Sequence, residues 1–275
     1  MTDKIIIIGK RSNLSKELKE SFSDSLVIGS DDIESLEIEL RSNQKISIIY
    51  NTCFKSNLLN SDNSNPIDYS NYSFHYLSKF INLCLKYKSK IKSILYSSSC
   101  AVYGENKLAN EKDDLKITNL YSALKASSEY LLKKFLDHED INLVNARIFN
   151  MYGGDDSFSV IWRIKQSIKK DLPFYLVNNG NNIRDFIHIS DVVKIFKLIL
   201  DLNFKGTINI STGIGTPISK IINLIQDIHN IKLHTVNIVR EEAKTCIGCN
   251  KIVKNKLKFN QFINIEDFII KEFKE

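Results

Sequence analysis

Residues 4–15 read KIIIIGKRSNLS, an apolar run that ends at a glycine and leads into a polar, serine-containing turn. An uninterrupted apolar run of this length is typical of a parallel strand that is buried on both faces of its sheet. The residues from Leu14 to Phe22 then carry apolar side chains at helical spacing. The stretch therefore predicts a strand, a tight turn and a helix in immediate succession.

The first half of the chain repeats this alternation. Further strand-type runs occupy residues 26–28, 46–50, 91–96 and 144–149. Helical spacing is found over residues 69–88 and 121–136. Strands that alternate with helices predict an α/β fold with a doubly wound parallel sheet. Ligands of such sheets bind beyond the carboxyl ends of the strands, so the residues that follow each strand are the candidates for chemistry.

The composition is that of an ordinary globular protein. Of 275 residues, 43% are hydrophobic and 25% are charged, and the formal net charge is +6. The lysines and arginines are scattered, whereas a nucleic-acid binder gathers them in a patch. No apolar run approaches the ~20 residues of a membrane span, and the run Ile5–Ile8 is too short for a signal peptide. We therefore expect a cytoplasmic protein that binds neither nucleic acid nor membrane.

The five cysteines do not suggest a disulfide framework, because their number is odd and the protein is expected to be cytoplasmic. Cys246 and Cys249 form a single CxxC, and a zinc ribbon needs a second pair at similar spacing. We interpret them as ordinary thiols in a late loop and predict no metal site.

The turn after the first strand offers contacts for a dinucleotide. Gly9, Ser12 and Ser15 occupy the three positions of a GxxGxxG spacing, where small residues let the backbone approach a pyrophosphate. An unrelated strand, turn and helix with a serine cap has the same pattern, so the motif alone leaves both interpretations open. The candidate cofactor-binding residues are Gly9, Arg11, Ser12, Asn13, Leu14 and Ser30, with Lys125 farther along the chain.

The choice between the two nicotinamide dinucleotides depends on the residues near the second strand. Arg11 is suited to hold the additional phosphate of NADP(H) on its guanidinium. An acid at the end of the second strand would favour NAD(H), but Gly29 stands there. These features favour NADP(H), and NAD(H) stays an alternative because Asp31 or Asp32 could reach the ribose.

A serine, a tyrosine and a lysine form the candidate catalytic set. The strand over residues 91–96 runs into a serine-rich segment that includes Ser99, and the next predicted helix begins with Tyr121 and Lys125. Tyr121 and Lys125 are four residues apart and therefore share a helix face. An adjacent ammonium favours the phenolate, which would lower the pKa of the tyrosine toward the neutral range. Ser99 could hold a substrate oxygen while Tyr121 moves its proton.

Four stretches, in this order, resemble the extended short-chain dehydrogenase/reductase family of sugar-nucleotide epimerases, dehydratases and reductases. They are YSSSCAVYG at 96–104, YSALK at 121–125, RIFNMYG at 147–153 and RDFIHISDVV at 184–193, and NISTG at 209–213 is similar to the family's next segment. The resemblance implies a Rossmann-type fold, a nucleotide-diphosphate sugar as substrate and a catalytic role for Ser99, Tyr121 and Lys125. It also implies that a homodimer could form through the helix that begins at Tyr121.

The resemblance assigns substrate contacts as well. Ser99 would contact the reacting sugar, Asn150 the diphosphate-nucleotide part, and Arg184 the diphosphate. An alternative for Arg184 is a structural salt bridge with Asp185. His188 and Asp191 are expected to hold the local fold.

The reaction is narrowed by the residues after Ser99. The family's dehydratases have an Asp-Glu pair there, and this chain has Cys100 and Ala101, so dehydration is not expected. NADPH-dependent reduction of a 4-keto, 6-deoxy nucleotide sugar is favoured. An NAD-dependent 4-epimerase is the alternative, and a non-catalytic dinucleotide-binding regulator is a distant third. A role in polysaccharide biosynthesis is a hypothesis from the substrate class.

We predict a Rossmann domain over residues 1–155 that is rejoined by 183–215. A small C-terminal substrate-binding lobe would use residues 156–182 and 216–275. Within this lobe, short strands are expected at 174–177 and 233–239, and a helix at 217–229.

Overall fold

The computed structural model describes residues 4–42, 44–51, 65–137 and 140–273. Its contacts divide the chain into two compact units. The first unit comprises residues 1–102, 117–147 and 196–208. The second unit comprises residues 103–116, 148–195 and 209–275. These ranges are more finely interleaved than the predicted ones, and the predicted assignment of a cofactor domain and a substrate lobe stays a prediction.

The first unit is built on a six-stranded sheet in the order β10-β6-β4-β3-β1-β2. Its strands are β1 (Lys4–Ile8), β2 (Leu26–Ile28), β3 (Ile46–Tyr50), β4 (Ile91–Ser99), β6 (Asn142–Ile148) and β10 (Gly206–Ile210). β1 pairs in parallel with β2 and β3, and β3 with β4. The chain therefore passes from β1 to one edge of the sheet and returns to the other side of β1. Such a reversal of strand order is where doubly wound sheets bind their ligands.

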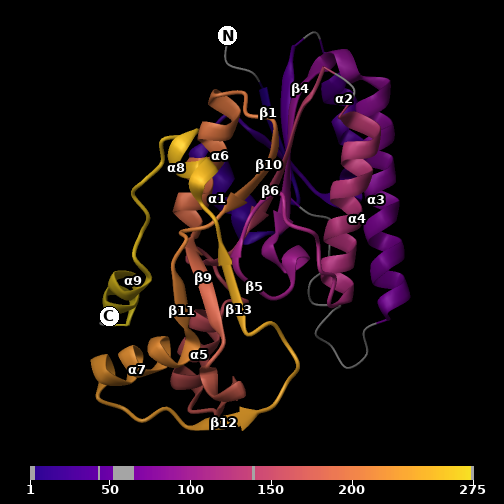
Figure 1. Cartoon of the computed structure of the whole chain (residues 1–275). Helices are drawn as coiled ribbons and strands as arrows, with labels where there is room; N and C mark the ends of the chain where they lie inside the picture. The colour runs from indigo at the N-terminus through magenta and orange to yellow at the C-terminus, as the bar shows by residue number, and fades with distance from the viewer. Residues whose placement is uncertain (1–3, 43, 52–64, 138–139, 274–275) are drawn as a thin grey trace. The chain divides into compact units, whose positions relative to one another are not determined.

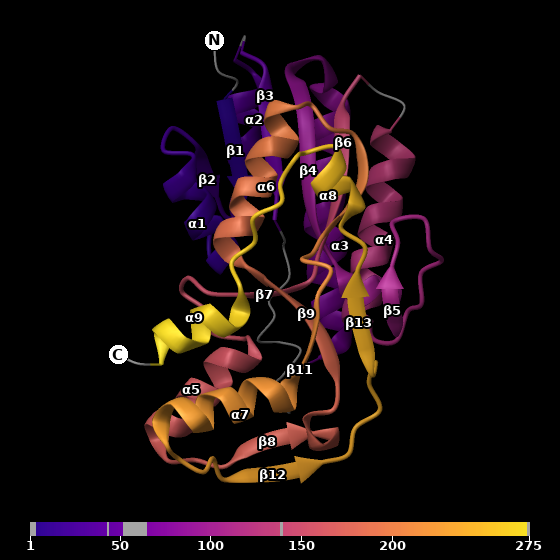
Figure 2. The same cartoon turned by 60° about the vertical axis from the view of Figure 1, so that its left-hand side comes forward.

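Helices cover both faces of this sheet. They are α1 (Asn13–Ser21), α2 (Ser35–Leu40), α3 (Pro66–Lys86) and α4 (Leu120–Leu136). α3 and α4 lie side by side on one face, and α1 lies on the other (Figures 1 and 2). Ile6 and Ile8 pack into the core under α2, α3 and α4, while Ile7 points to the opposite face and is also fully buried. Burial on both faces explains why the first strand is an uninterrupted apolar run.

The second unit contains a five-stranded sheet in which β11, β9, β13 and β5 follow one another and β7 pairs with β9. The strands are β5 (Asn106–Ala109), β7 (Asn150–Tyr152), β9 (Ile183–His188), β11 (Gly215–Pro217) and β13 (Thr245–Gly248). The predicted short strands are present as β8 (Phe174–Val177) and β12 (Thr235–Ile238), which pair in parallel. The remaining helices are α5 (Val160–Lys170), α6 (Ile189–Asp201, which spans both units), α7 (Ile218–His229), α8 (Lys251–Asn255) and α9 (Ile265–Glu272).

The CxxC pair does not lie in a loop as predicted. Cys246 is part of β13, and both Cys246 and Cys249 are buried thiols that form no disulfide. Cys246 sits opposite Asn106 of β5 in the sheet, so strand pairing fixes its position. None of the helices that the structure describes has the length and apolar character of a membrane span.

Candidate functional site

Ser99, Tyr121 and Lys125 come together in the first unit. Ser99 is the last residue of β4, and α4 begins just before Tyr121. Asn119 fixes this helix start, because its side chain accepts a hydrogen bond from the backbone N–H of Ser122 at 2.9 Å. The Tyr121 hydroxyl is hydrogen-bonded to the Ser99 side chain. The Lys125 Nζ lies 5.8 Å from the centroid of the Tyr121 ring. We call these three residues the catalytic cluster, after the role that the sequence predicts for them.

The electrostatics of Tyr121 differ from the sequence prediction. Burial raises the pKa of Tyr121 to about 12, although the hydrogen bond to Ser99 acts in the opposite direction. Lys125, which the helix spacing predicts to lower this pKa, donates a hydrogen bond to the Ser97 carbonyl oxygen at 2.7 Å. The Lys125 ammonium is therefore hydrogen-bonded to the backbone of β4 and also faces the Tyr121 ring. In the protein alone, burial therefore keeps Tyr121 a protonated acid at neutral pH.

A buried ion pair lies beneath the catalytic cluster and was not anticipated from the sequence. The Arg147 guanidinium donates to both carboxylate oxygens of Glu129, at 3.0 and 3.2 Å from Nε and 2.7 Å from Nη2. The Ser98 hydroxyl donates to the same carboxylate. Glu129 is one turn after Lys125 on α4, and this spacing was the available sequence signal. The pair joins α4 to β4 and β6, the elements that carry or border the cluster.

The turn between β1 and α1 fits a dinucleotide pyrophosphate. Gly9 has a φ of 116°, which an L side chain rarely adopts. Ser12 caps α1 by accepting from the Ser15 backbone N–H at 3.1 Å. Asn51 donates to the hydroxyls of Ser12 and Ser15, so both serines are engaged in holding the turn. α1 has no acidic residue in its first turn, and its N-terminal N–H groups are suited to an anion.

The remaining cofactor candidates surround this turn. Asn13 and Leu14 form the first positions of α1, and the Leu14 side chain is buried, so it can meet a ligand only through its backbone. Arg11 is exposed within the turn. Ser30 is buried after β2, and its hydroxyl lies 3.0 Å from that of Tyr72 on α3. In the predicted pyrophosphate site, we therefore expect backbone N–H groups and the N-terminus of α1 to make more of the contacts than the serine hydroxyls, which already accept hydrogen bonds from Asn51.

The predicted substrate residues Asn150 and Arg184 lie in the second unit, on the paired strands β7 and β9. The Asn150 side chain donates to the Asp185 carbonyl oxygen at 3.1 Å. Arg184 donates to Glu242 at 3.1 Å and to its neighbour's carbonyl oxygen at 3.0 Å. The structural alternative, a salt bridge between Arg184 and Asp185, is therefore wrong, because the ion-pair partner of Arg184 is Glu242.

Asp185 has a separate structural task. Its buried carboxylate accepts from the backbone and hydroxyl of Thr212 at 2.9 and 2.6 Å, and from the N–H groups of Gly213 and Gly248 at 2.8 and 3.2 Å. These bonds tie β9 to two later segments of the chain. Across the described ranges, no group of three or more His, Cys, Asp or Glu side chains is arranged to hold a metal ion.

Comparison with known proteins places this chain in a family. The model of the NAD dependent epimerase/dehydratase family matches residues 4–211, well over half of the chain. The chain belongs to the NAD dependent epimerase/dehydratase family. The matched range includes the β1–α1 turn, the catalytic cluster and β9, so it covers every residue that the sequence nominated for a site.

Individual relatives of this epimerase/dehydratase chain differ in their named reactions. The GDP-6-deoxy-D-talose 4-dehydrogenase of Aggregatibacter actinomycetemcomitans is 34% identical over 154 residues, which are 54% of this chain and 50% of that protein. Matches to other curated relatives span 34% to 66% of those proteins' lengths. The chain thus matches only about half of a typical curated relative.

Two solved structures have the same fold. The UDP-glucose 4-epimerase of Thermus thermophilus in complex with NAD has a TM-score of 0.80 at 15% identity, covering 97% of this chain and 96% of that one. RMD from Pseudomonas aeruginosa complexed with NADPH has a TM-score of 0.80 at 19% identity, covering 99% of both chains. Proteins of this fold therefore include complexes with either dinucleotide.

Proposed function

We propose that this chain is an NAD(P)-dependent enzyme that reduces the 4-keto group of a 6-deoxy nucleotide sugar. The observation that carries this proposal is the catalytic cluster, in which a protonated Tyr121 is hydrogen-bonded to Ser99 and faces Lys125. A ketone reduction needs a proton donor at the carbonyl oxygen. Tyr121 is already in the donor form.

Each residue of the cluster has a defined task in this reaction. Ser99 donates a hydrogen bond to the carbonyl oxygen and orients it, and Tyr121 transfers its proton to that oxygen as the C=O bond becomes an alcohol. Reduced nicotinamide, when bound, supplies the hydride to the carbonyl carbon. Lys125 then stabilises the phenolate left on Tyr121, because an ammonium beside a phenolate favours the charged form. The hydride and the proton together balance the reduction.

The second unit supplies the contacts proposed for the nucleotide diphosphate. Arg184 has the fork geometry that grips phosphate oxygens, and its present partner Glu242 is an anion that a diphosphate would replace. Asn150 is on the neighbouring strand. The relative named as a GDP-6-deoxy-D-talose 4-dehydrogenase supports a nucleotide sugar that reacts at position 4.

A 4-epimerase is the second candidate, and it is favoured by the Asp31 carboxylate beside the end of β2, a feature of sites that take NAD. In that reaction Tyr121 would accept the proton of a 4-hydroxyl group and return it after the sugar has turned. Cys100 and Ala101 follow Ser99 in either case and provide no carboxylate for dehydration. A regulator without catalysis has no use for the cluster.

The two reactions differ in their cofactor balance, which gives the test. The protein would be incubated with GDP-, UDP- and dTDP-linked 4-keto-6-deoxy sugars and reduced cofactor and, separately, with the corresponding 4-hydroxy sugars and oxidised cofactor, and the change in nicotinamide absorbance would be compared with the sugar products. Reduction oxidises one cofactor for each sugar converted. Epimerisation of a 4-hydroxy sugar proceeds with no net oxidation. Binding of the cofactor without turnover of any of these sugars would contradict both proposals and favour the regulator.

Cytoplasmic location, homodimerisation and a role in polysaccharide biosynthesis stay predictions that accompany this function. Tyr130 and Phe135 leave apolar surface exposed on α4, with 66% and 48% of their surfaces accessible. Such surface is compatible with the predicted pairing of this helix in a dimer.

A further inference from the structure

Strand β4 extends beyond its pairing with the neighbouring strand β3. The last pair between them joins Tyr96 to Tyr50, and β4 then continues over residues 97–99. On this side of β4, strand pairing therefore does not fix the segment that ends in Ser99. In the proposed reaction the Ser99 hydroxyl has to meet the reacting oxygen in a defined geometry, so the contacts that hold this segment bear on the rate.

Helix α4 contacts the two ends of this segment through the catalytic cluster. Tyr121 is hydrogen-bonded to the Ser99 side chain, and Lys125 donates to the Ser97 carbonyl oxygen at 2.7 Å. In the proposed reaction, however, the hydroxyls of Ser99 and Tyr121 both turn to the substrate oxygen. The contact between these two hydroxyls is then given up, and it cannot hold β4 against α4 during the reaction.

The middle residue of the segment, Ser98, makes a contact that the proposed reaction does not use. Its hydroxyl donates to the carboxylate of Glu129, which follows Lys125 by one turn on the same face of α4. Ser98 and Glu129 are both buried. The hydrogen bond between them therefore joins β4 to α4 in the free protein and equally when a substrate is bound.

Arg147 fixes the orientation of the Glu129 carboxylate. Its guanidinium donates from Nε and Nη2 and reaches both carboxylate oxygens. Arg147 lies on β6, which is next to β4 in the sheet, and both side chains of the ion pair are buried. Such a pair keeps one geometry, because leaving either buried charge unpaired is costly. The sheet itself therefore sets the position of the acceptor to which Ser98 is bonded.

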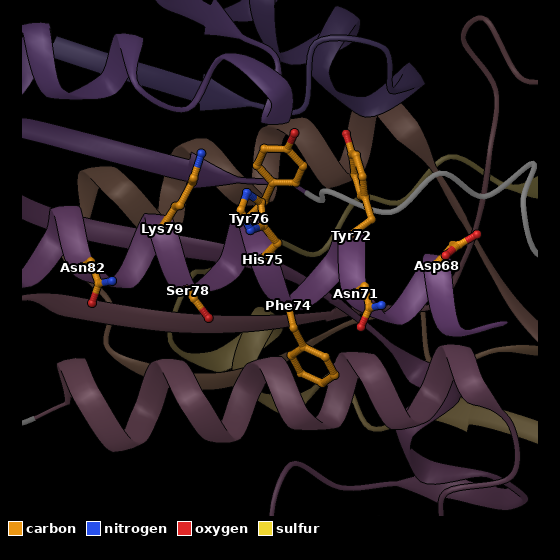
Figure 3. A pocket seen from close by; sticks show the side chains of 9 residues that line it. All are labelled: Asp68, Asn71, Tyr72, Phe74, His75, Tyr76, Ser78, Lys79 and Asn82. Atoms are coloured by element: carbon orange, nitrogen blue, oxygen red, sulfur yellow. The ribbon is translucent and has the colours of Figure 1, made fainter. Parts of the chain in front are cut away.

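The apolar contacts of α4 restrain its position less strictly. α4 lies beside α3, where Phe74 of α3 packs against the apolar cluster that includes Leu132 of α4. Figure 3 shows Phe74 on the side of α3 opposite Tyr72 and Tyr76. Apolar packing is non-directional, whereas a hydrogen bond weakens steeply as its angle departs from linearity. The directional contact of Ser98 is therefore better suited to set where α4 stands against the end of β4.

We propose that the hydrogen bond between Ser98 and Glu129 is a positioning contact, which sets the distance between Ser99 on β4 and Tyr121 on α4. The proposal rests on the proposed function, because this distance affects a rate only where both hydroxyls act on one substrate oxygen. Ser98 and Glu129 touch neither the substrate nor the reacting atoms. They act on the chemical step through the placement of two other residues, and a displacement of about 1 Å in such a site can lower a rate by about 100-fold.

The test removes the Ser98 hydroxyl and compares the result with a matched serine of the same strand. Ser93 and Ser98 are each 4% exposed, and the Ser93 hydroxyl donates to the Ser47 hydroxyl at 2.8 Å. Ser98→Ala and Ser93→Ala therefore delete the same group at the same burial. We expect Ser98→Ala to lower kcat by about 10- to 100-fold with little change in KM, since placement and not binding is lost. Ser93→Ala should leave kcat and KM unchanged, and urea unfolding should show that both variants fold.

A readout that needs no turnover separates this proposal from the proposed function. In protein labelled with ¹³C at tyrosine Cζ, the NMR signal of Tyr121 is identified by its loss in Tyr121→Phe. This signal should shift in Ser98→Ala, because the contact of Tyr121 with Ser99 changes, and should stay in place in Ser93→Ala.

An unchanged kcat in Ser98→Ala, or equal effects of the two serine substitutions on kcat or on the Tyr121 signal, would overturn the positioning contact while leaving the proposed function in place. If the wild-type protein turns over no sugar and the Tyr121 signal moves in Ser98→Ala alone, the proposed function fails. The control of the Tyr121 environment by Ser98 is then still supported.

Discussion

The catalytic cluster and the segment after β2 place their polar groups in different ways. This segment comprises Gly29, Ser30 and Asp31 with Tyr72 of α3 beside it, and we call it the ribose end after the part of a dinucleotide expected there. In the cluster, the side chains project from β4 and α4, and a buried ion pair lies under them. At the ribose end, the carboxylate is exposed and reaches its place by a short turn that folds back on the strand. The comparison teaches that spacing along regular elements identifies a site directly, whereas a turn can move a group to a position that its place in the sequence does not suggest.

The largest effect is expected from removing the proton donor of the cluster. Tyr121→Phe should retain the fold and lower kcat by about 100- to 10,000-fold, the range that a general acid contributes. Tyr130→Phe is the matched control, because it removes a hydroxyl from an exposed tyrosine of the same helix and should leave kcat unchanged. Steady-state kinetics with circular dichroism would separate lost chemistry from lost structure. Near wild-type activity in Tyr121→Phe would contradict the proposed mechanism.

The ion pair under the cluster should have the next largest effect. Glu129→Gln leaves the buried Arg147 guanidinium without its charged partner, and breaking a buried pair costs about 3–5 kcal/mol. We expect a loss of this size in the free energy of unfolding, measured with urea. Glu266→Gln disrupts the exposed pair with Lys220, and exposed pairs contribute about 0–1 kcal/mol. Equal effects of the two substitutions would show that burial does not set the strength of the pair.

The same contrast explains how much of the molecule the sequence could predict. The apolar run at Ile5–Ile8 and the helical spacing before Leu136 were sufficient to predict a parallel sheet covered by helices. A strand that is buried on both faces is apolar throughout, whereas a helix that is buried on one face has apolar residues every three or four positions. The predicted direction of the Tyr121 pKa shift was wrong, since the helix spacing brings a lysine near the ring but does not reveal that the tyrosine is buried, and burial raises this pKa. Glu129 and Arg147 lie on the consecutive elements α4 and β6, and the spacing along the chain does not reveal that the fold pairs them.

Arg11 tests the ribose end from the other side and should have a smaller effect. If the enzyme is the NAD-dependent 4-epimerase that the Asp31 carboxylate favours, Arg11 can contact only the pyrophosphate, which NADH and NADPH share. Arg11→Ala should then weaken the binding of both by a similar factor of about 10 or less, since an exposed cation contributes modestly. Titration with both nucleotides measures it. A loss confined to NADPH would restore the sequence prediction that Arg11 holds a 2′-phosphate.

The smallest change is expected in the pH dependence of the reaction. A reduction rate that stays constant near neutral pH would show that Tyr121 is protonated throughout this range. Reduction requires protonated Tyr121, so the rate falls only as the pH rises through the pKa of that phenol. Because burial raises this pKa to about 12 in the free protein, kcat/KM for reduction, which reports ionisations of the free enzyme, should stay level between about pH 7 and pH 9. Oxidation of a 4-hydroxyl group requires the phenolate instead, and its kcat/KM should rise with pH over the same range. A fall in the reduction rate near neutral pH would mean that Lys125 governs Tyr121 after all, as the helix spacing alone had predicted.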